Sequence, residues 1–144
     1  MYLSDVLNIK GWHTVTTGKD VTIVAYSITV GQALEAAEKL AEEGIDAEVI
    51  DLRTLRPLDC DTVLRSLAKT NRLVVVEEGP LTGGWAGEVL AVATEQGLHD
   101  IDDAWRIATP DHPIPFSPPL EDAFLPSADS IATAVAARLG VAQT

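Results

Sequence analysis

Residues 72–79 read Arg-Leu-Val-Val-Val-Glu-Glu-Gly, a run that is almost continuously apolar until two acids and a glycine end it. Such a run predicts a strand that is covered on both faces, as in a parallel sheet. Two further runs rich in β-branched residues, Val21–Tyr26 and Ala47–Asp51, predict strands of the same kind. Weaker strand signals lie at Trp12–Thr17 and Ala104–Ala108.

Helical periodicity fills the intervals between these strands. Apolar residues at helical spacing predict helices over residues 30–43, 60–70 and 85–96, and a fourth that follows Ser127 and ends at Gly140. Ser27 and Asp59 are the residue types that cap helices, and they precede the first and second of these helices. Strands that alternate with helices in this way predict a three-layer α/β domain with a mostly parallel sheet.

Length and charge exclude several classes of function. A chain of 144 residues is about one domain. Ten Lys and Arg residues against 22 Asp and Glu give a net charge of −12, which argues against binding to nucleic acid or to anionic membranes. The single cysteine, Cys60, excludes an internal disulfide, and no apolar run is long enough to cross a bilayer or to resemble a signal peptide. We therefore expect a cytoplasmic protein.

The glycine-rich segment Gly79–Gly87 lies between a predicted strand and a predicted helix, where phosphate-binding loops occur. It matches neither the dinucleotide nor the P-loop pattern, so tight packing of helix on sheet is the favoured interpretation. Glu77 and Glu78 end the preceding strand and allow two interpretations. Paired acids at a sheet edge can perform acid–base chemistry, but a cap or ion pair for one and solvent for the other is favoured.

The segment Asp51–Asp59 places two arginines and two acids around a turn that leads into a helix. Arg53 and Arg56 can pair with these acids or with the edge at Glu77, which favours a structural ion-pair network over a substrate-anion site. The three histidines lie singly, without the spacing of a metal site.

Six of the eight prolines lie between Pro110 and Pro126. So many fixed φ angles and missing donors predict a stiff arm without regular structure. Such an arm either wraps over the core of its own domain or contacts a partner.

Four motifs now point to a family. Gly18–Tyr26, Ile50–Asp59, Arg72–Gly79 and Asp111–Phe116 stand in the order of the C-terminal domain of the transketolase-like family. They resemble in particular the beta subunit of thiamine diphosphate-dependent 2-oxoacid dehydrogenases of the pyruvate or branched-chain type. Each motif is ordinary alone, and together they are specific.

The resemblance implies a five-stranded mixed sheet with one antiparallel strand, for which Trp12–Thr17 is the candidate. Residues 1–17 would then form an N-terminal extension and residues 18–144 the domain. It implies an assembly role, with the decarboxylase alpha subunit, a pyrimidine-binding domain and the small basic binding domain of the acyltransferase as partners. Thiamine diphosphate and magnesium would be held by other domains, so no catalytic, cofactor or metal residue carries over to this chain. The resemblance further implies that the whole complex would carry out oxidative decarboxylation of a 2-oxoacid with acyl transfer to lipoyl groups.

We expect the candidate interface and loop-organising residues to be those of the motifs and loops: Asp51, Arg53, Arg56, Pro57, Asp59, Glu77, Glu78, Gly79, Gly84, Trp85, Asp111, Pro113, Pro115 and Phe116. Large side chains at Trp12, Trp85, Phe116 and Phe124 would lie either in the core or in an interface patch, and the helix near Trp85 would mediate self-association. Two alternatives stay open: the same domain in a transketolase or deoxyxylulose-phosphate synthase, and a free-standing α/β protein that binds a small ligand at Gly79–Gly87.

Overall fold

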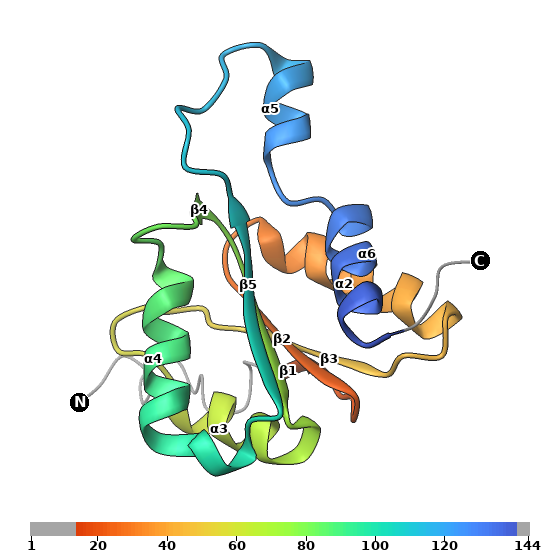
Figure 1. The fold of residues 1–144 in the computed structure, drawn as a ribbon, viewed down its shortest axis with the longest axis vertical. Helices are drawn as coiled ribbons and strands as arrows, with labels where there is room; N and C mark the ends of the chain where they lie inside the picture. Colours follow the sequence, from red (N-terminus) through yellow and green to blue (C-terminus); the bar gives the residue numbers. More distant parts are fainter. Residues whose placement is uncertain (1–13, 141–144) are drawn as a thin grey trace.

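The structure is a computed structural model, and it describes residues 14–140 of the chain (Figure 1). Its helices and strands alternate through most of this range. In chain order they are β1 (Thr14–Thr16), β2 (Val21–Ala25), α2 (Thr29–Glu42), β3 (Ala47–Asp51), α3 (Cys60–Thr70), β4 (Arg72–Pro80), α4 (Trp85–Gly97), the 3-10 helix η1 (Leu98–Asp100), β5 (Asp103–Thr109), α5 (Pro118–Phe124) and α6 (Ala128–Arg138).

The five strands form one sheet in the order β1-β3-β2-β4-β5. Strands β2 to β5 run parallel, and β1 pairs antiparallel with β3 at one edge. All five residues of β2 are buried, as expected for a central strand. The mixed three-layer architecture is therefore confirmed. The antiparallel strand covers residues 14–16 of the stretch in which it is expected, and residues 12 and 13 lie outside the described range.

Two apolar layers hold the helices on the sheet. Helices α2 and α6 cover one face, and α3 and α4 cover the other (Figure 1). Alternate residues of the central strands point to opposite layers: Ile23 and Val74 pack toward α2 and α6, whereas Val24 and Val75 pack toward α3 and α4. Because these side chains are fully buried, their removal from water supplies much of the driving force for folding.

Of the two predicted helix caps, one is confirmed and the other is wrong. Asp59 does cap α3, since its carboxylate accepts a hydrogen bond from the backbone N–H of Thr62 at 3.1 Å. The prediction that Ser27 caps α2 is wrong. Ser27 has a left-handed φ of +57°, which is incompatible with the extended conformation of a capping residue, and the N-cap of α2 is Ile28, which makes no side-chain capping bond.

The prediction that the proline-rich arm lacks regular structure is also wrong in part. Within residues 110–126, the segment Pro118–Phe124 forms helix α5, which starts at the two adjacent prolines. Proline is tolerated in the first turn of a helix because the N–H that it lacks has no partner there and its φ is already helical. The residues before α5 follow the predicted irregular path.

Candidate functional site at the carboxyl edge of the sheet

The predicted site residues gather at the edge where the parallel strands end. One group runs from Asp51, the last residue of β3, to Asp59, and a second runs from Glu77 in β4 to Trp85 at the start of α4. The third begins at Asp111, just after β5. The second and third groups are neighbours because β4 and β5 pair, whereas β2 lies between the first group and the second. In sheets of this class, binding sites form at this edge.

Glu77 is the most constrained of these residues. Its side chain is only 1% exposed, and its two carboxylate oxygens accept hydrogen bonds from the backbone N–H groups of Trp85 at 2.8 Å and Ala86 at 3.0 Å. The Tyr26 hydroxyl donates a third bond to Glu77 at 3.1 Å. Glu77 therefore caps the positive end of α4, as the structural interpretation of this acid predicts.

The glycine-rich loop is shaped by this carboxylate. A Cβ atom on Gly84 would lie 2.2 Å from Glu77 Oε1 and 2.4 Å from the carbonyl oxygen of Pro80. A Cβ atom on Gly79 would lie 2.9 Å from Glu77 Oε2. The loop is therefore packed tightly around the carboxylate of Glu77. Because that anion occupies the N-terminus of α4, the structure argues against a phosphate-binding role for the loop.

Glu78 and Trp85 are both half-buried. The indole of Trp85 packs against the apolar layer beneath α3 and α4, which makes it partly a core residue. Its ring N–H is buried and has no acceptor within the described part of the chain.

The loop after β3 contains one ion pair of the predicted network. Arg53 Nε lies 2.5 Å from Asp51 Oδ2, and the backbone of Arg53 is left-handed with a φ of +56°. Asp59 serves as the cap of α3. Arg56 and Pro57 are exposed and joined by a cis peptide bond. Arg53 is thus the arginine of the predicted network for which the structure shows an ion pair.

Asp111 ties the start of the arm to the loop before α4. Its carboxylate accepts hydrogen bonds from the backbone N–H of Thr82 at 2.9 Å and from the Thr82 hydroxyl at 2.5 Å. These bonds hold the pKa of Asp111 below its usual value. Arg106 donates to the carbonyl oxygen of Leu81 at 2.6 Å. The hydroxyl of Thr109 donates to the carbonyl oxygen of Gly79 at 2.9 Å. The base of the arm is thus joined to the loop by several polar contacts.

Beyond Asp111 the arm exposes apolar side chains. Phe116 is fully exposed, Ile114 is 65% exposed and Leu120 is 59% exposed. Pro113 is exposed, while Pro115 and Phe124 are half-buried. Of the four large side chains expected in the core or in a patch, Phe116 is the exposed one among the described residues, and Trp12 lies outside them.

Sequence reasoning missed two residues of this edge. Tyr26 bonds to Glu77, and Thr82 bonds to Asp111. A signal for Tyr26 was present, since it directly follows the buried strand β2 and therefore ends at the same edge as Glu77. Thr82 gave no comparable signal, because a threonine in a turn has many ordinary roles.

Tyr26 provides a test of the Glu77 environment. Burial and the Glu77 carboxylate raise the pKa of Tyr26 from 10.0 to about 12. The folded state thus holds the phenol proton more tightly, and its contribution to stability is complete below pH 10 and is lost as the pH rises toward 12. In a Tyr2→Phe background, which leaves Tyr26 as the single tyrosine, the ultraviolet titration of the native chain should have its midpoint near 12. A midpoint near 10 would contradict the contact with Glu77.

The described residues offer neither a cluster of metal ligands nor a membrane-spanning helix. Between residues 14 and 140 no group of three or more His, Cys, Asp or Glu side chains is arranged to hold a metal ion. Within the same range, no helix has the length and apolar character needed to cross a membrane.

Comparison with known proteins identifies the family. The model of the transketolase C-terminal domain matches residues 11–131. The chain belongs to this family. It is 50% identical over 121 residues to the beta subunit of acetoin:2,6-dichlorophenolindophenol oxidoreductase from Cupriavidus necator, and 51% identical over 118 residues to the mitochondrial pyruvate dehydrogenase E1 beta-1 subunit of Arabidopsis thaliana. These matches cover 83% and 81% of this chain but 36% and 32% of the relatives, so this transketolase C-terminal domain spans about a third of their length.

Solved structures agree with this assignment. A split-gene transketolase, described as an inactive beta4 tetramer, superposes with a TM-score of 0.78 and 32% identity over 90% of this chain and 42% of its own. The 2-oxoglutarate:ferredoxin oxidoreductase of Magnetococcus marinus shares the fold, with a TM-score of 0.59 and 16% identity over 87% of this chain and 18% of its own.

Proposed function

We propose that this domain is the C-terminal assembly and docking module of the beta subunit of a thiamine diphosphate-dependent 2-oxoacid dehydrogenase. The observation that carries the proposal is the 51% identity over 118 residues with a pyruvate dehydrogenase E1 beta subunit. The assembled enzyme would catalyse oxidative decarboxylation of a 2-oxoacid with acyl transfer to lipoyl groups. The exposed apolar side chains at the carboxyl edge support a docking role, because such surfaces mark interfaces.

Thiamine diphosphate and magnesium would be held by other domains of that enzyme. The described residues of the glycine-rich loop do not fit the cofactor, since the N-terminus of α4 is filled by Glu77 and the space beside Gly84 is smaller than a methyl group. We assign no catalytic step to the described residues.

The proposed partners are the alpha subunit, the pyrimidine-binding domain and the basic binding domain of the acyltransferase. The net charge of −12 favours a basic partner, because complementary charge speeds and orients docking. We propose further that the chain self-associates through α4 and that it is located in the cytoplasm.

Acetoin is a second candidate substrate for the whole enzyme. Beta subunits of acetoin oxidoreductases from Cupriavidus necator and Bacillus subtilis are 50% and 45% identical to this chain. A domain that supplies no catalytic residue would serve either substrate equally, so the acetoin enzyme offers a suitable host for a test.

The test is a chimera in which this chain replaces the matching segment of the Cupriavidus necator beta subunit. We expect the chimera, coexpressed with its alpha subunit, to co-purify as a complex of the same mass as the native pair. The unmodified beta subunit is the positive control, and a beta subunit truncated before the segment is the negative control. A chimera that is folded by circular dichroism yet purifies without the alpha subunit would reject the proposed function.

A further inference from the structure

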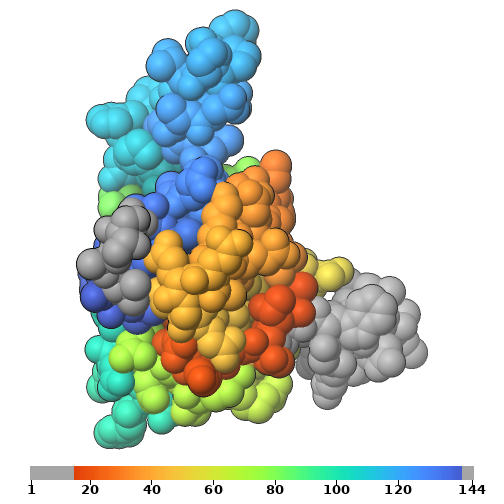
Figure 2. Space-filling model, turned by 90° about the vertical axis from the view of Figure 1, so that its right-hand side faces the viewer, coloured from red at the N-terminus to blue at the C-terminus, as the bar shows by residue number. Residues whose placement is uncertain are grey.

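The arm formed by residues 110–126 projects from the domain between two attached ends. No residue of helix α5, which lies within the arm, is buried. A helix of seven residues is too short to be stable on its own in water, since helices in proteins gain their stability mainly by packing an apolar face. In both views the arm stands off from the layers formed by the sheet and its helices (Figures 1 and 2). The contacts at its two ends therefore decide how firmly the arm is held.

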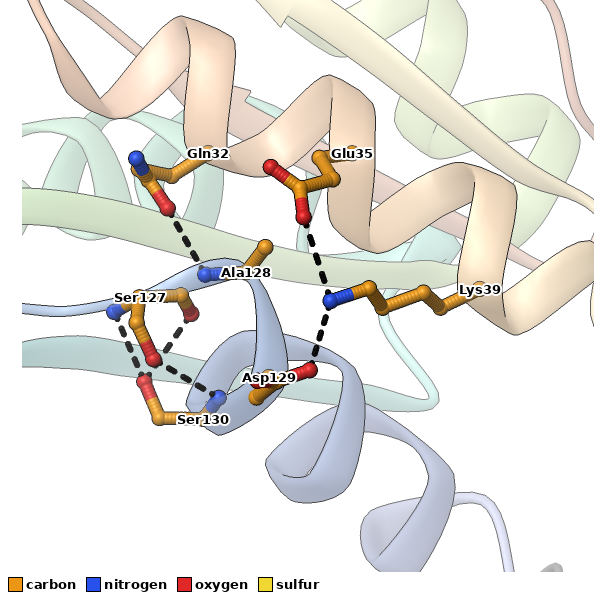
Figure 3. Close-up of polar contacts among 7 residues, drawn as sticks. All are labelled: Gln32, Glu35, Lys39, Ser127, Ala128, Asp129 and Ser130. Carbon is orange, nitrogen blue, oxygen red and sulfur yellow. Dashed lines mark hydrogen bonds and ion pairs between the residues drawn. The ribbon is translucent and has the colours of Figure 1, made fainter.

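The far end of the arm is fixed to helices α2 and α6. Ser127 caps α6, and the backbone N–H of Ala128 donates a hydrogen bond to Gln32 Oε1 of α2 at 2.8 Å (Figure 3). Lys39 of α2 lies 2.6 Å from Asp129 in the first turn of α6 (Figure 3). Ala128 is itself buried in the apolar layer between these helices and the sheet. This end of the arm therefore stays with the core.

The near end is held by the loop that joins β4 to α4. Thr109, the last residue of β5, is buried, and its hydroxyl donates to the carbonyl oxygen of Gly79 at 2.9 Å. The backbone N–H of Leu81 donates to the carbonyl oxygen of Thr109 at 2.9 Å. Two residues further on, Asp111 accepts the two hydrogen bonds from Thr82. The near attachment thus has a buried part at Thr109 and an exposed part at Asp111.

The two sides of this exposed part differ in how firmly they are held. Thr82 belongs to a loop whose other end is fixed by Glu77, because the Glu77 carboxylate accepts from Trp85 and packs against Gly84. Asp111 belongs to the arm, whose helix has no packed face. Both Thr82 and Asp111 are exposed, so water competes for the bonds between them. Such a contact opens at a lower free energy than the packed core, and the arm then moves rather than the loop.

From these contacts we infer that Thr82 and Asp111 form a latch, and that the arm opens as a unit when the latch is released while the rest of the domain stays folded. In the open state α5 loses its helical structure, because neither a packed face nor a fixed start supports it. The buried residues Thr109 and Ala128 limit the opening to residues 110–126. This change takes place within one chain, so it goes beyond the proposed function and does not depend on it.

The latch decides whether the apolar side chains of the arm have a fixed position. Ile114 is 65% exposed and Phe116 is fully exposed. In the latched state both side chains lie at defined places relative to the carboxyl edge of the sheet. In the open state the same side chains sample a range of positions. The arm is thus an order–disorder element, and the latch sets its equilibrium.

Amide hydrogen exchange of the native chain tests the inference without a substitution. The backbone N–H groups of Leu120 and Glu121 donate to the carbonyl oxygen of Ser117, and that of Leu125 donates to the carbonyl oxygen of Glu121. These amides report the opening of the arm, whereas the amides of the buried strand β2 report the unfolding of the domain. At low concentrations of urea we expect exchange in the arm to be nearly independent of urea and exchange in β2 to accelerate. Equal acceleration at both places would overturn the inference, because the arm would then open only when the domain unfolds.

Matched substitutions test whether Thr82 and Asp111 hold the arm. Asp111→Ala removes both bonds of the latch and should accelerate exchange in the arm by about tenfold, whereas Thr82→Val removes the hydroxyl bond alone and should accelerate it by about threefold. The controls are Asp61→Ala, at an exposed acid in the first turn of α3, and Thr94→Val, at an exposed hydroxyl that bonds within α4. Both controls should change exchange in the arm by less than about twofold. Exchange in the arm that is unchanged in Asp111→Ala, or that rises together with exchange in β2, would overturn the inference.

A conservative variant separates hydrogen bonding from charge. Asp111→Asn keeps an acceptor oxygen for the backbone N–H of Thr82 and offers an amide N–H to the Thr82 hydroxyl, so it should preserve the latch. We expect exchange in the arm of this variant to stay within about threefold of the native rate. The same acceleration in Asp111→Asn as in Asp111→Ala would contradict a latch made of hydrogen bonds.

Discussion

Replacing Gly84 with alanine is expected to lower the free energy of unfolding by about 2–4 kcal/mol, because the added methyl group has no space. Its Cβ would lie 2.2 Å from Glu77 Oε1, 2.8 Å from Glu77 Cδ and 2.4 Å from the carbonyl oxygen of Pro80. Neither neighbour moves easily, since Glu77 is held by three hydrogen bonds and Pro80 contributes backbone. For a chain of this size the melting temperature should fall by roughly 10 °C.

Substitutions at two other glycines distinguish the effect of limited space from the effect of backbone conformation. Gly31, in α2, has no atom within 4 Å of its potential Cβ, so Gly31→Ala should leave stability unchanged or raise it by up to about 1 kcal/mol. Gly83 also has open space but a φ of +79°, so Gly83→Ala should cost about 1 kcal/mol through backbone strain alone. Thermal and denaturant unfolding of the three variants decide the matter. If Gly84→Ala is no more destabilising than Gly83→Ala, the tight packing around Glu77 is refuted.

Replacing Glu77 with glutamine should destabilise the domain by about 2–4 kcal/mol, even though the two side chains have nearly the same shape. The carboxylate accepts from both Trp85 N–H and Ala86 N–H, one at each oxygen. A glutamine can offer only one acceptor oxygen, so its amide group must place N–H against one of these donors. The favourable charge at the N-terminus of α4 is lost as well.

Glu78→Gln is the matched control for this substitution. Glu78 is adjacent in the same strand and is half-buried, and it makes none of the capping bonds to α4. Its substitution should change stability by less than about 0.5 kcal/mol. Denaturant unfolding measures both variants under the same conditions. Equal effects of the two substitutions would show that Glu77 contributes only general charge to this edge.

Much of the fold followed from local patterns in the sequence. The helix over residues 60–70 has the predicted bounds, including Asp59 as its cap, because apolar spacing and capping residue agree there. The prediction that Ser27 caps α2 fails because it rests on residue type alone. The turn from β2 into α2 requires a left-handed backbone conformation at Ser27. Helix α5 was missed because prolines were read as breakers without regard to their place in the first turn.

The site was less predictable than the fold. Glu77 was assigned two possible roles, and its partners lie eight and nine residues later in the chain. Only the return of the loop onto the end of β4 brings them together, and that geometry is not encoded in any short motif. Phe116 could equally have been a core residue, because an isolated aromatic residue in a proline-rich stretch carries no periodicity that would place it. Its full exposure became evident from the three-dimensional structure.

The central claim is that this domain supports assembly while other domains carry the chemistry. Its most direct test is the rate of acetoin-dependent reduction of dichlorophenolindophenol by the chimeric beta subunit assembled with the Cupriavidus necator alpha subunit. We expect a rate within about a factor of ten of the native enzyme, because no group that touches the reacting atoms has been exchanged. An assembled chimera that has the mass of the native complex but does not reduce the dye would contradict it.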